Sequence, residues 1–212
     1  MKVGILGSGD VGQTLAAGFF KYNHDAMIGT RTPAKLADFT QAHPGVKVGS
    51  FADAAKFGDV LVLAVKGDVA ADVLTMAGPA NLSGKTVLDA TNPIARKPPT
   101  DNVIHAFTGA DESLMMRLQR QFTDVHFVKA FSCVGSASMV DPKFKGGKPS
   151  MFIAGNNAGA KKLATTICEQ FGFEVEDMGT AEAARVIEPL AILWCIPGFR
   201  SDEWTHAFKL LH

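Results

Sequence analysis

Short, continuously apolar stretches alternate with longer amphipathic stretches along most of the chain. Val60–Val65 is apolar at successive positions, which is typical of a strand covered on both faces, whereas Val11–Lys21 has a helical period. The predicted strands are Lys2–Leu6, Asp25–Ile28, Val46–Val48, Asp59–Val65, Thr86–Asp89, His126–Phe131, Met151–Ala154 and Phe173–Asp177. The predicted helices between them are Val11–Lys21, Ala34–Ala42, Val69–Met76, Leu114–Gln121 and Ala158–Phe171. Such alternation predicts an α/β fold with a doubly wound, mostly parallel sheet.

The pattern changes after Gly179. Thr180–Ile196 and Asp202–Leu211 both have helical periodicity, and Pro197-Gly198 between them predicts a break. We therefore expect a small C-terminal helical lobe. Residues 1–134 are expected to form the main α/β domain, and residues 135–212 to complete the sheet and add the lobe.

A glycine-rich loop follows the first predicted strand and opens the first predicted helix. Its sequence, Gly7-Ser8-Gly9-Asp10-Val11-Gly12, fits the dinucleotide-binding fingerprint in its proper strand–loop–helix context. Gly7 suits the tight turn, Gly9 leaves room for a pyrophosphate beside the backbone, and Gly12 allows the helix to pack closely. Asp10 opposes a phosphate by its charge; it either caps the helix, which we favour, or points towards a second substrate. The loop predicts an NAD(P)-binding Rossmann fold.

The end of the second predicted strand indicates which dinucleotide binds. NAD enzymes usually carry an acidic residue there, whereas this chain continues Gly29-Thr30-Arg31-Thr32-Pro33. Arg31 offers a fork of donors for a 2′-phosphate, and Thr30 offers a hydroxyl. Thr32-Pro33 is typical of a helix N-cap and first helical residue, with Lys35 as a second cation in the first turn. We therefore predict NADP(H) rather than NAD(H).

In doubly wound sheets the ligand lies across the carboxyl ends of the strands. The fourth predicted strand is followed by Val65-Lys66, the fifth by Asn92-Pro93, and Lys129 stands near the end of the sixth. We expect Val65 near the adenine or ribose and Lys66 near the phosphates. Asn92 can bond ribose hydroxyls or a carboxamide, in a loop that Pro93 stiffens. Lys129 is either catalytic or, as we favour, structural or phosphate-directed.

Composition narrows the range of functions. Lysine and arginine together number 21, as do aspartate and glutamate, which argues against nucleic-acid binding. No apolar run approaches the roughly 18 residues of a membrane span, and no secretory signal is recognisable. Cys133, Cys168 and Cys195 form no CxxC pair, which fits buried thiols in a reducing cytoplasm. The six histidines are scattered, so we predict no metal site and no catalytic triad.

Several ordered blocks carry a family resemblance: Gly7–Gly12, Ile28–Pro33, Val128–Phe131 and Met151–Asn156. Together they resemble the predicted dinucleotide-binding enzymes related to the deazaflavin (coenzyme F420)-dependent NADP oxidoreductases. The soluble domain of the six-transmembrane metalloreductases is similar too. The resemblance runs from Met1 to about Leu193. It implies an NADP-binding Rossmann fold whose C-terminal lobe seats a second ring against the nicotinamide.

The resemblance also implies individual site residues. NADP would be contacted by Ser8, Asp10, Val11, Thr30, Arg31, Val65, Asn92 and Ala130. The segment Glu182–Leu190 resembles one near the second ring, where Arg185 is the main candidate; a surface salt bridge with Glu182 or Glu188 is the alternative. The deazaflavin enzymes have a histidine where this chain has Ser132, which makes Ser132 a second-substrate candidate.

The expected function is hydride transfer between NADP(H) and a deazaflavin, a flavin (FMN or FAD) or a flavin-carrying acceptor. Such transfer depends on alignment of two rings more than on a protein acid or base. A module that senses NADP(H) without turnover is one alternative. A reductase of a small carbonyl or imine is another, although that class relies on a larger helical domain. The apolar stretches Leu190–Trp194 and Ala207–Leu211 suggest a homodimer surface, but both can equally belong to the core.

Overall fold

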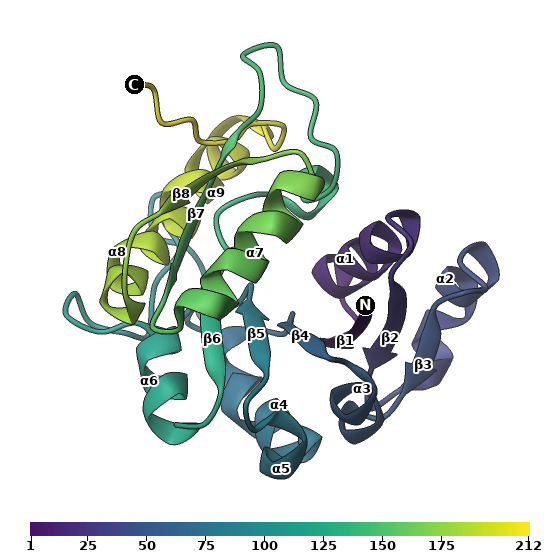
Figure 1. Ribbon diagram of the computed structural model, residues 1–212. Helices are drawn as coiled ribbons and strands as arrows, with labels where there is room; N and C mark the ends of the chain where they lie inside the picture. The colour runs from purple at the N-terminus through teal and green to yellow at the C-terminus, as the bar shows by residue number, and fades with distance from the viewer.

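A computed structural model of the chain covers residues 1–212 and contains one eight-stranded sheet. The strand order is β3-β2-β1-β4-β5-β6-β7-β8, and only β6 and β7 are antiparallel (Figure 1). The strands are β1 (Lys2–Leu6), β2 (Asp25–Gly29), β3 (Lys47–Gly49), β4 (Val60–Leu63), β5 (Thr86–Asp89), β6 (His126–Lys129), β7 (Ser150–Gly155) and β8 (Glu174–Asp177). The predicted α/β fold with a mostly parallel sheet is confirmed.

Helices cover both faces of the sheet and form the lobe. They are α1 (Asp10–Lys21), α2 (Ala37–Ala42), α3 (Phe51–Phe57), α4 (Ala70–Ala77), α5 (Pro79–Leu82), α6 (Leu114–Gln121), α7 (Ala158–Gln170), α8 (Ala184–Ile187) and α9 (Pro189–Ser201). Short 3-10 turns are η1 (Pro33–Leu36), η2 (Gly67–Val69), η3 (Ser136–Ser138) and η4 (Ala181–Ala183). No helix combines the length and apolarity needed to cross a bilayer.

The continuous apolar runs of the strands serve two cores, one on each face of the sheet. In β4, Val60 and Val62 belong to a core of 26 buried residues, whereas Leu61 and Leu63 belong to a second core of 20. Helices α1 and α7 contribute to the first core and α3, α4 and α6 to the second. Because side chains alternate across a strand, both faces demand apolar residues, which explains the pattern in the sequence.

Two short helices were not predicted from the sequence. Helix α3 is seven residues long and begins at a capping box, in which Ser50 and Asp53 exchange side-chain and backbone bonds. Helix α5 is four residues long and begins at Pro79, directly after Gly78. Neither is long enough to show a helical period, so only their start signals were available.

The C-terminal lobe differs from its prediction in two ways. Thr180–Ile196 is divided into η4, α8 and α9, and α9 then continues through Pro197 to Ser201. The expected break at Pro197-Gly198 is therefore wrong. A Cβ on Gly198 would overlap the Trp204 indole, so this glycine makes room for an aromatic ring instead of ending the helix.

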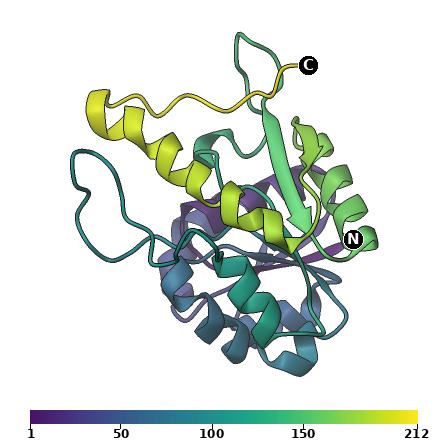
Figure 2. The same cartoon turned by 90° about the vertical axis from the view of Figure 1, so that its left-hand side faces the viewer.

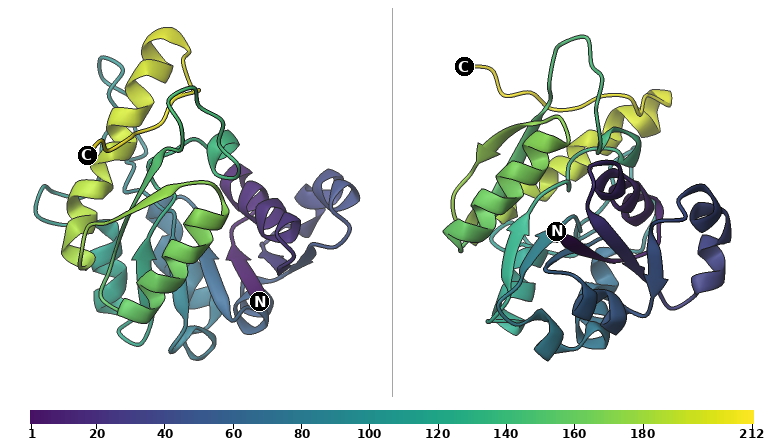
Figure 3. Two further views of the ribbon diagram at one scale, coloured as in Figure 1. Left: turned by 45° about the horizontal axis from the view of Figure 1, so that its top comes forward. Right: turned by 45° about the vertical axis from the view of Figure 1, so that its right-hand side comes forward.

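The second expected helix, Asp202–Leu211, is also wrong, because this segment has no regular secondary structure. It runs back along the lobe from the end of α9 (Figures 2 and 3). The Ser150 amide of β7 donates to the Phe208 carbonyl at 2.9 Å, and the Leu210 amide donates to Ser150 Oγ at 3.0 Å. Tertiary contacts with β7 thus override the local helical pattern.

Candidate functional site

The glycine loop between β1 and α1 has the geometry of a phosphate-binding turn. Gly7 has φ +136°, and a Cβ there would overlap the Ala64 carbonyl of the neighbouring strand end. A Cβ on Gly12 would overlap the Gly7 carbonyl, so close packing of helix on loop requires glycine. A Cβ on Gly9, by contrast, would meet no atom within 4 Å. Gly9 therefore borders open space at the N-terminus of α1, where the helix dipole favours an anion.

Asp10 does not cap α1. The N-cap is Gly9, with φ −78° and ψ −176°, and no side chain bonds the first amides of the helix. Asp10 is the first helical residue and its side chain is exposed. The capping interpretation is therefore wrong, and Asp10 and Val11 stand in the first turn beside the open space of Gly9.

The residues predicted to bind a 2′-phosphate follow the end of β2. The Ser8 and Thr30 hydroxyls lie 2.9 Å apart, which ties this strand end to the glycine loop, and the Thr32 amide donates to Thr30 Oγ1 at 3.1 Å. Arg31 is exposed and makes no ion pair or hydrogen bond within the chain. Thr32 is the N-cap of η1 with Pro33 in its first turn, as predicted, although the element is a 3-10 turn and the Thr32 side chain makes no capping bond. Lys35, in η1, is likewise exposed and unpaired.

The strand ends adjoin one another in a continuous series along this edge of the sheet. A Cβ on Gly7 would lie 3.0 Å from Val65 Cγ1, and one on Gly67 would overlap the Asn92 carbonyl. The Asn92 side-chain amide in turn donates to the Ser132 carbonyl at 2.6 Å. The structure thereby joins the glycine loop to the ends of β4, β5 and β6.

Two other predicted cofactor residues lie differently along this edge. Ala130 is fully buried in the core, and its amide donates to the Asp89 carbonyl at 3.1 Å. Lys66, which precedes η2, is exposed and makes no ion pair.

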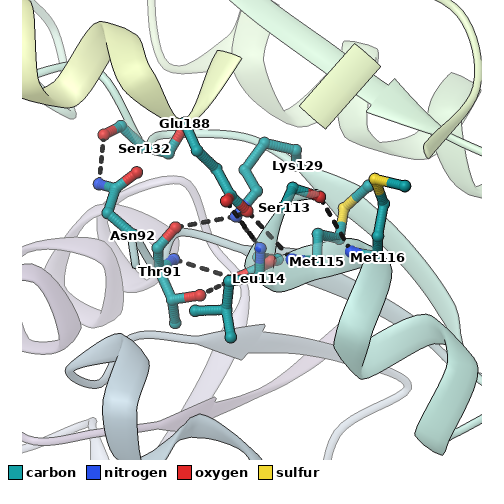
Figure 4. Close-up of polar contacts among 10 residues, drawn as sticks. Thr91, Asn92, Ser113, Leu114, Met115, Met116, Lys129, Ser132 and Glu188 are labelled. Carbon is teal, nitrogen blue, oxygen red and sulfur yellow. Dashed lines mark hydrogen bonds and ion pairs between the residues drawn. The ribbon is translucent and has the colours of Figure 1, made fainter. Parts of the chain in front are cut away.

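Behind this edge lies a buried ion cluster. Lys129 Nζ lies 2.7 Å from Asp89 Oδ2 and 2.8 Å from Glu188 Oε1, and it donates to the Thr91 carbonyl at 2.8 Å (Figure 4). All three charged side chains are at most 1% exposed. The two Glu188 oxygens also accept the first amides of α6, from Leu114 at 2.8 Å and Met115 at 3.0 Å. The Glu188 carboxylate of the lobe thus caps the N-terminus of α6 and forms an ion pair with Lys129 of the sheet.

The cluster assigns Lys129 a structural role. Burial by itself lowers the pKa of Lys129, but the charges and hydrogen bonds of Asp89 and Glu188 outweigh it and hold the pKa above its ordinary value. The ammonium is therefore charged, enclosed by protein groups and not available as a proton donor. This agrees with the structural alternative that the sequence favoured.

Asp89 and Glu188 were not recognised from the sequence. A signal for Asp89 was present, because Asp89 and Lys129 end two neighbouring apolar strands and are register partners in the sheet. Glu188 lies 59 residues after Lys129, and no local pattern connects the two.

A pocket of about 130 Å³ opens beside the end of β5. Its wall includes Pro93, Arg185, Glu188 and Pro189, together with residues of the loop before α6 such as Thr108. A predicted cofactor residue and a predicted second-substrate residue thus share one cavity. The Arg185 side chain is 42% exposed, and its Nη1 lies 3.6 Å from Asp111 Oδ1. Its ion-pair partner is thus Asp111 and neither Glu182 nor Glu188. Because this pair is long and exposed, the guanidinium keeps donors for a ligand.

The one thiol next to this edge is not a nucleophile. Burial raises the pKa of Cys133 to about 12, so it is protonated at neutral pH. No group of three or more histidine, cysteine, aspartate or glutamate side chains is arranged to hold a metal. The arrangement can bind and align a dinucleotide and a second ligand.

Comparison with known proteins identifies the family. The model of the family described as NADP oxidoreductase, coenzyme F420-dependent, matches residues 2–93. A crystal structure from Arthrobacter sp. FB24, provisionally described as an F420-dependent NADP reductase, is 32% identical, with a TM-score of 0.93 and coverage of 100% of both chains. The chain belongs to this family. It is therefore an NADP-dependent oxidoreductase with the Rossmann fold that the sequence predicted.

The chain is also similar to a metalloreductase and to an imine reductase. The rat metalloreductase STEAP3 is 28% identical over 92% of this chain, and the chain spans 38% of the length of that relative. An imine reductase of Streptomyces aurantiacus is 14% identical with a TM-score of 0.68, and the match covers 95% of this chain and 64% of that one. The second likeness shows a shared fold.

Proposed function

We propose that this family member binds NADPH along the carboxyl edge of the sheet and passes hydride to a deazaflavin, a flavin or a flavin-carrying partner. The main support is that the predicted binding residues adjoin one another along this edge. They run from Thr30 through the glycine loop to Asn92, and then to the pocket that Pro93 and Arg185 line. Open space at Gly9 fits a pyrophosphate, and the unpaired Arg31 fits a 2′-phosphate. When bound, NADPH supplies a hydride at its nicotinamide.

In this proposal the protein binds and aligns. Amides at the start of α1 and the cations Arg31, Lys35 and Lys66 hold the phosphates. Val65 and Pro93 pack against the ribose and ring, with Asn92 beside them and the buried Ala130 behind. Arg185 faces the acceptor in the pocket beside Pro93. We retain residues 1–134 as the NADP-binding domain and 135–212 as the lobe that seats the acceptor.

Arg31→Ala tests the 2′-phosphate assignment. Losing a charge-assisted hydrogen bond costs about 1.5–3 kcal/mol, so the Kd for NADPH is expected to rise by roughly 10–150-fold. Binding of NADH, which lacks the phosphate, is expected to be nearly unchanged. Arg200→Ala is the matched control, because Arg200 is also an exposed arginine without an ion pair. Equal losses for NADPH and NADH would contradict the assignment.

The acceptor is tested by anaerobic assays with NADPH and, separately, F420, FMN, FAD, a ketone and a cyclic imine. Loss of the nicotinamide absorbance with one flavin-type ring would support the proposal and name that ring. Turnover of only the ketone or imine would contradict it. Arg185→Ala is expected to raise the acceptor KM while leaving the Kd for NADPH unchanged, because Arg185 lies in the pocket and not on the glycine loop.

We also propose a homodimer in a reducing cytoplasm. Leu193 and Phe199 on α9 are 53% and 44% exposed, and Leu211 is 80% exposed, so the lobe presents an apolar surface. The three thiols form no disulfide, and two of them are buried. A monomer mass in sedimentation at micromolar concentration would contradict the homodimer.

A further inference from the structure

Two buried polar atoms at the ends of β5 and β6 have no hydrogen-bond partner. They are Asn92 Oδ1 and Ser132 Oγ, and Ser132 is only 5% exposed. At least about 90% of buried polar groups in folded proteins are paired, because an unpaired buried donor or acceptor keeps its full desolvation penalty. Two such atoms on adjoining loops therefore point to a ligand that completes both.

The Asn92 amide has one defined orientation. Its nitrogen donates to the Ser132 carbonyl at 2.6 Å, as Figure 4 shows. A carbonyl only accepts, so the reversed amide would set two acceptors against each other. Asn92 Oδ1 is consequently an acceptor without a donor. The Ser132 hydroxyl, on the residue whose carbonyl Asn92 contacts, can donate.

The turn that presents Ser132 has a strained backbone. Phe131 has φ +61°, a left-handed conformation that is rare and unfavourable for a bulky residue. Its ring is held near Phe171 and Phe173, with centroid distances of 5.9 and 6.0 Å, and its amide faces Met151 Sδ at 3.0 Å. Packing thus maintains the turn, and such maintained strain is typical of functional sites.

We propose that Asn92 and Ser132 form the recognition site for the nicotinamide carboxamide. A primary carboxamide carries an NH₂ donor and a carbonyl acceptor on the same carbon. Asn92 Oδ1 accepts from the NH₂, and the Ser132 hydroxyl donates to the carbonyl. The inference rests on the proposed binding of NADP(H) along this edge and deepens it. It assigns Ser132, which the sequence suggested for the acceptor, to the cofactor.

The test uses two cofactor analogues that each remove one half of the carboxamide pairing. The 3-acetylpyridine analogue of NADP⁺ has a methyl group in place of the NH₂, and the thionicotinamide analogue has sulfur in place of the oxygen. Wild type is expected to bind NADP⁺ about tenfold more tightly than the acetylpyridine analogue. Asn92→Leu is expected to abolish that preference by weakening NADP⁺ alone. Ser132→Ala is expected to abolish the preference over the thionicotinamide analogue and keep the other.

Adenosine 2′,5′-bisphosphate is the control ligand, because it has no nicotinamide. Its Kd is expected to be unchanged in both variants, which also shows that they are folded. Variants that weaken NADP⁺ and both analogues equally would overturn the carboxamide assignment and indicate ribose contacts. An unchanged preference in both variants would overturn it as well. Failure of wild type to bind NADP⁺ and the bisphosphate would instead contradict the proposed function.

Discussion

Lys129→Met is expected to lower the free energy of unfolding by about 3–5 kcal/mol, because it leaves Asp89 and Glu188 as uncompensated buried charges. The side chain makes ion pairs of 2.7 and 2.8 Å with these carboxylates and also donates to the Thr91 carbonyl. Methionine replaces the apolar stem but none of these bonds. Urea unfolding of the variant and wild type measures the difference.

Lys209→Met is the matched control for this prediction. Lys209 pairs with Glu174 at the surface, where the glutamate is half exposed, so its loss is expected to cost at most about 1 kcal/mol. A Lys129→Met variant as stable as Lys209→Met would contradict the structural role of the cluster.

The deficit of Lys129→Met also has an expected pH dependence. Asp89 and Glu188 hold the pKa of Lys129 above its ordinary value, although burial alone would lower it. A group whose pKa is raised by folding contributes stability that is fully present below its unfolded pKa and is lost as the pH rises through its folded pKa. The deficit relative to wild type is therefore expected to be full at neutral pH and to shrink only in strongly alkaline solution.

Gly9→Ala is expected to weaken NADPH binding by about 10–100-fold while leaving the fold almost intact. The new Cβ meets no protein atom within 4 Å and the backbone φ is ordinary, so stability is expected to change by less than about 1 kcal/mol. The same methyl group occupies the space in which the pyrophosphate approaches the loop amides. Each charge-assisted bond lost costs about 1.5–3 kcal/mol, which sets the scale of the affinity loss.

Gly12→Ala, in contrast to Gly9→Ala, is expected to destabilise the fold. Its Cβ would overlap the Gly7 carbonyl, so overpacking is expected to cost about 1–3 kcal/mol of stability in addition to cofactor affinity. Gly146→Ala is the matched control for Gly9, because its Cβ is equally free of neighbours in a loop between β6 and β7. Calorimetry and fluorescence titration separate the two effects. An unchanged NADPH affinity in Gly9→Ala would contradict the pyrophosphate position.

Much of the fold could be predicted because its signals are local. Thr86–Asp89 and Leu114–Gln121 were predicted to the residue, since an apolar run and a clear helical period define them. The predictions for β4 and β6 each run two residues past the end of the strand, because the apolar run continues beyond the last ladder bond, and the prediction for β4 also begins one residue early. Asp202–Leu211 failed because β7 holds this segment in a non-helical path.

The candidate site divides in the same way. The glycine loop, Arg31 and the Thr32-Pro33 start of η1 stand in contiguous motifs, so the sequence predicted their place. Asn92 and Ser132 are 40 residues apart, and their hydrogen bond depends on the pairing of β5 with β6. Glu188 is separated in the sequence by 73 or 74 residues from the α6 amides that donate to it. Contacts of that kind follow from topology and have no counterpart in local periodicity.

The position of Glu188 fixes one wall of the pocket. Swinging the lobe away from the sheet would strand Lys129 and uncover the N-terminus of α6, so the wall formed by Glu188 and Pro189 is anchored. The opposite wall, 106–110, belongs to a long loop without helix or extended ladder, which projects from the molecule in Figure 2. The pocket therefore combines one wall fixed by a buried ion cluster with another formed by a loop of irregular backbone.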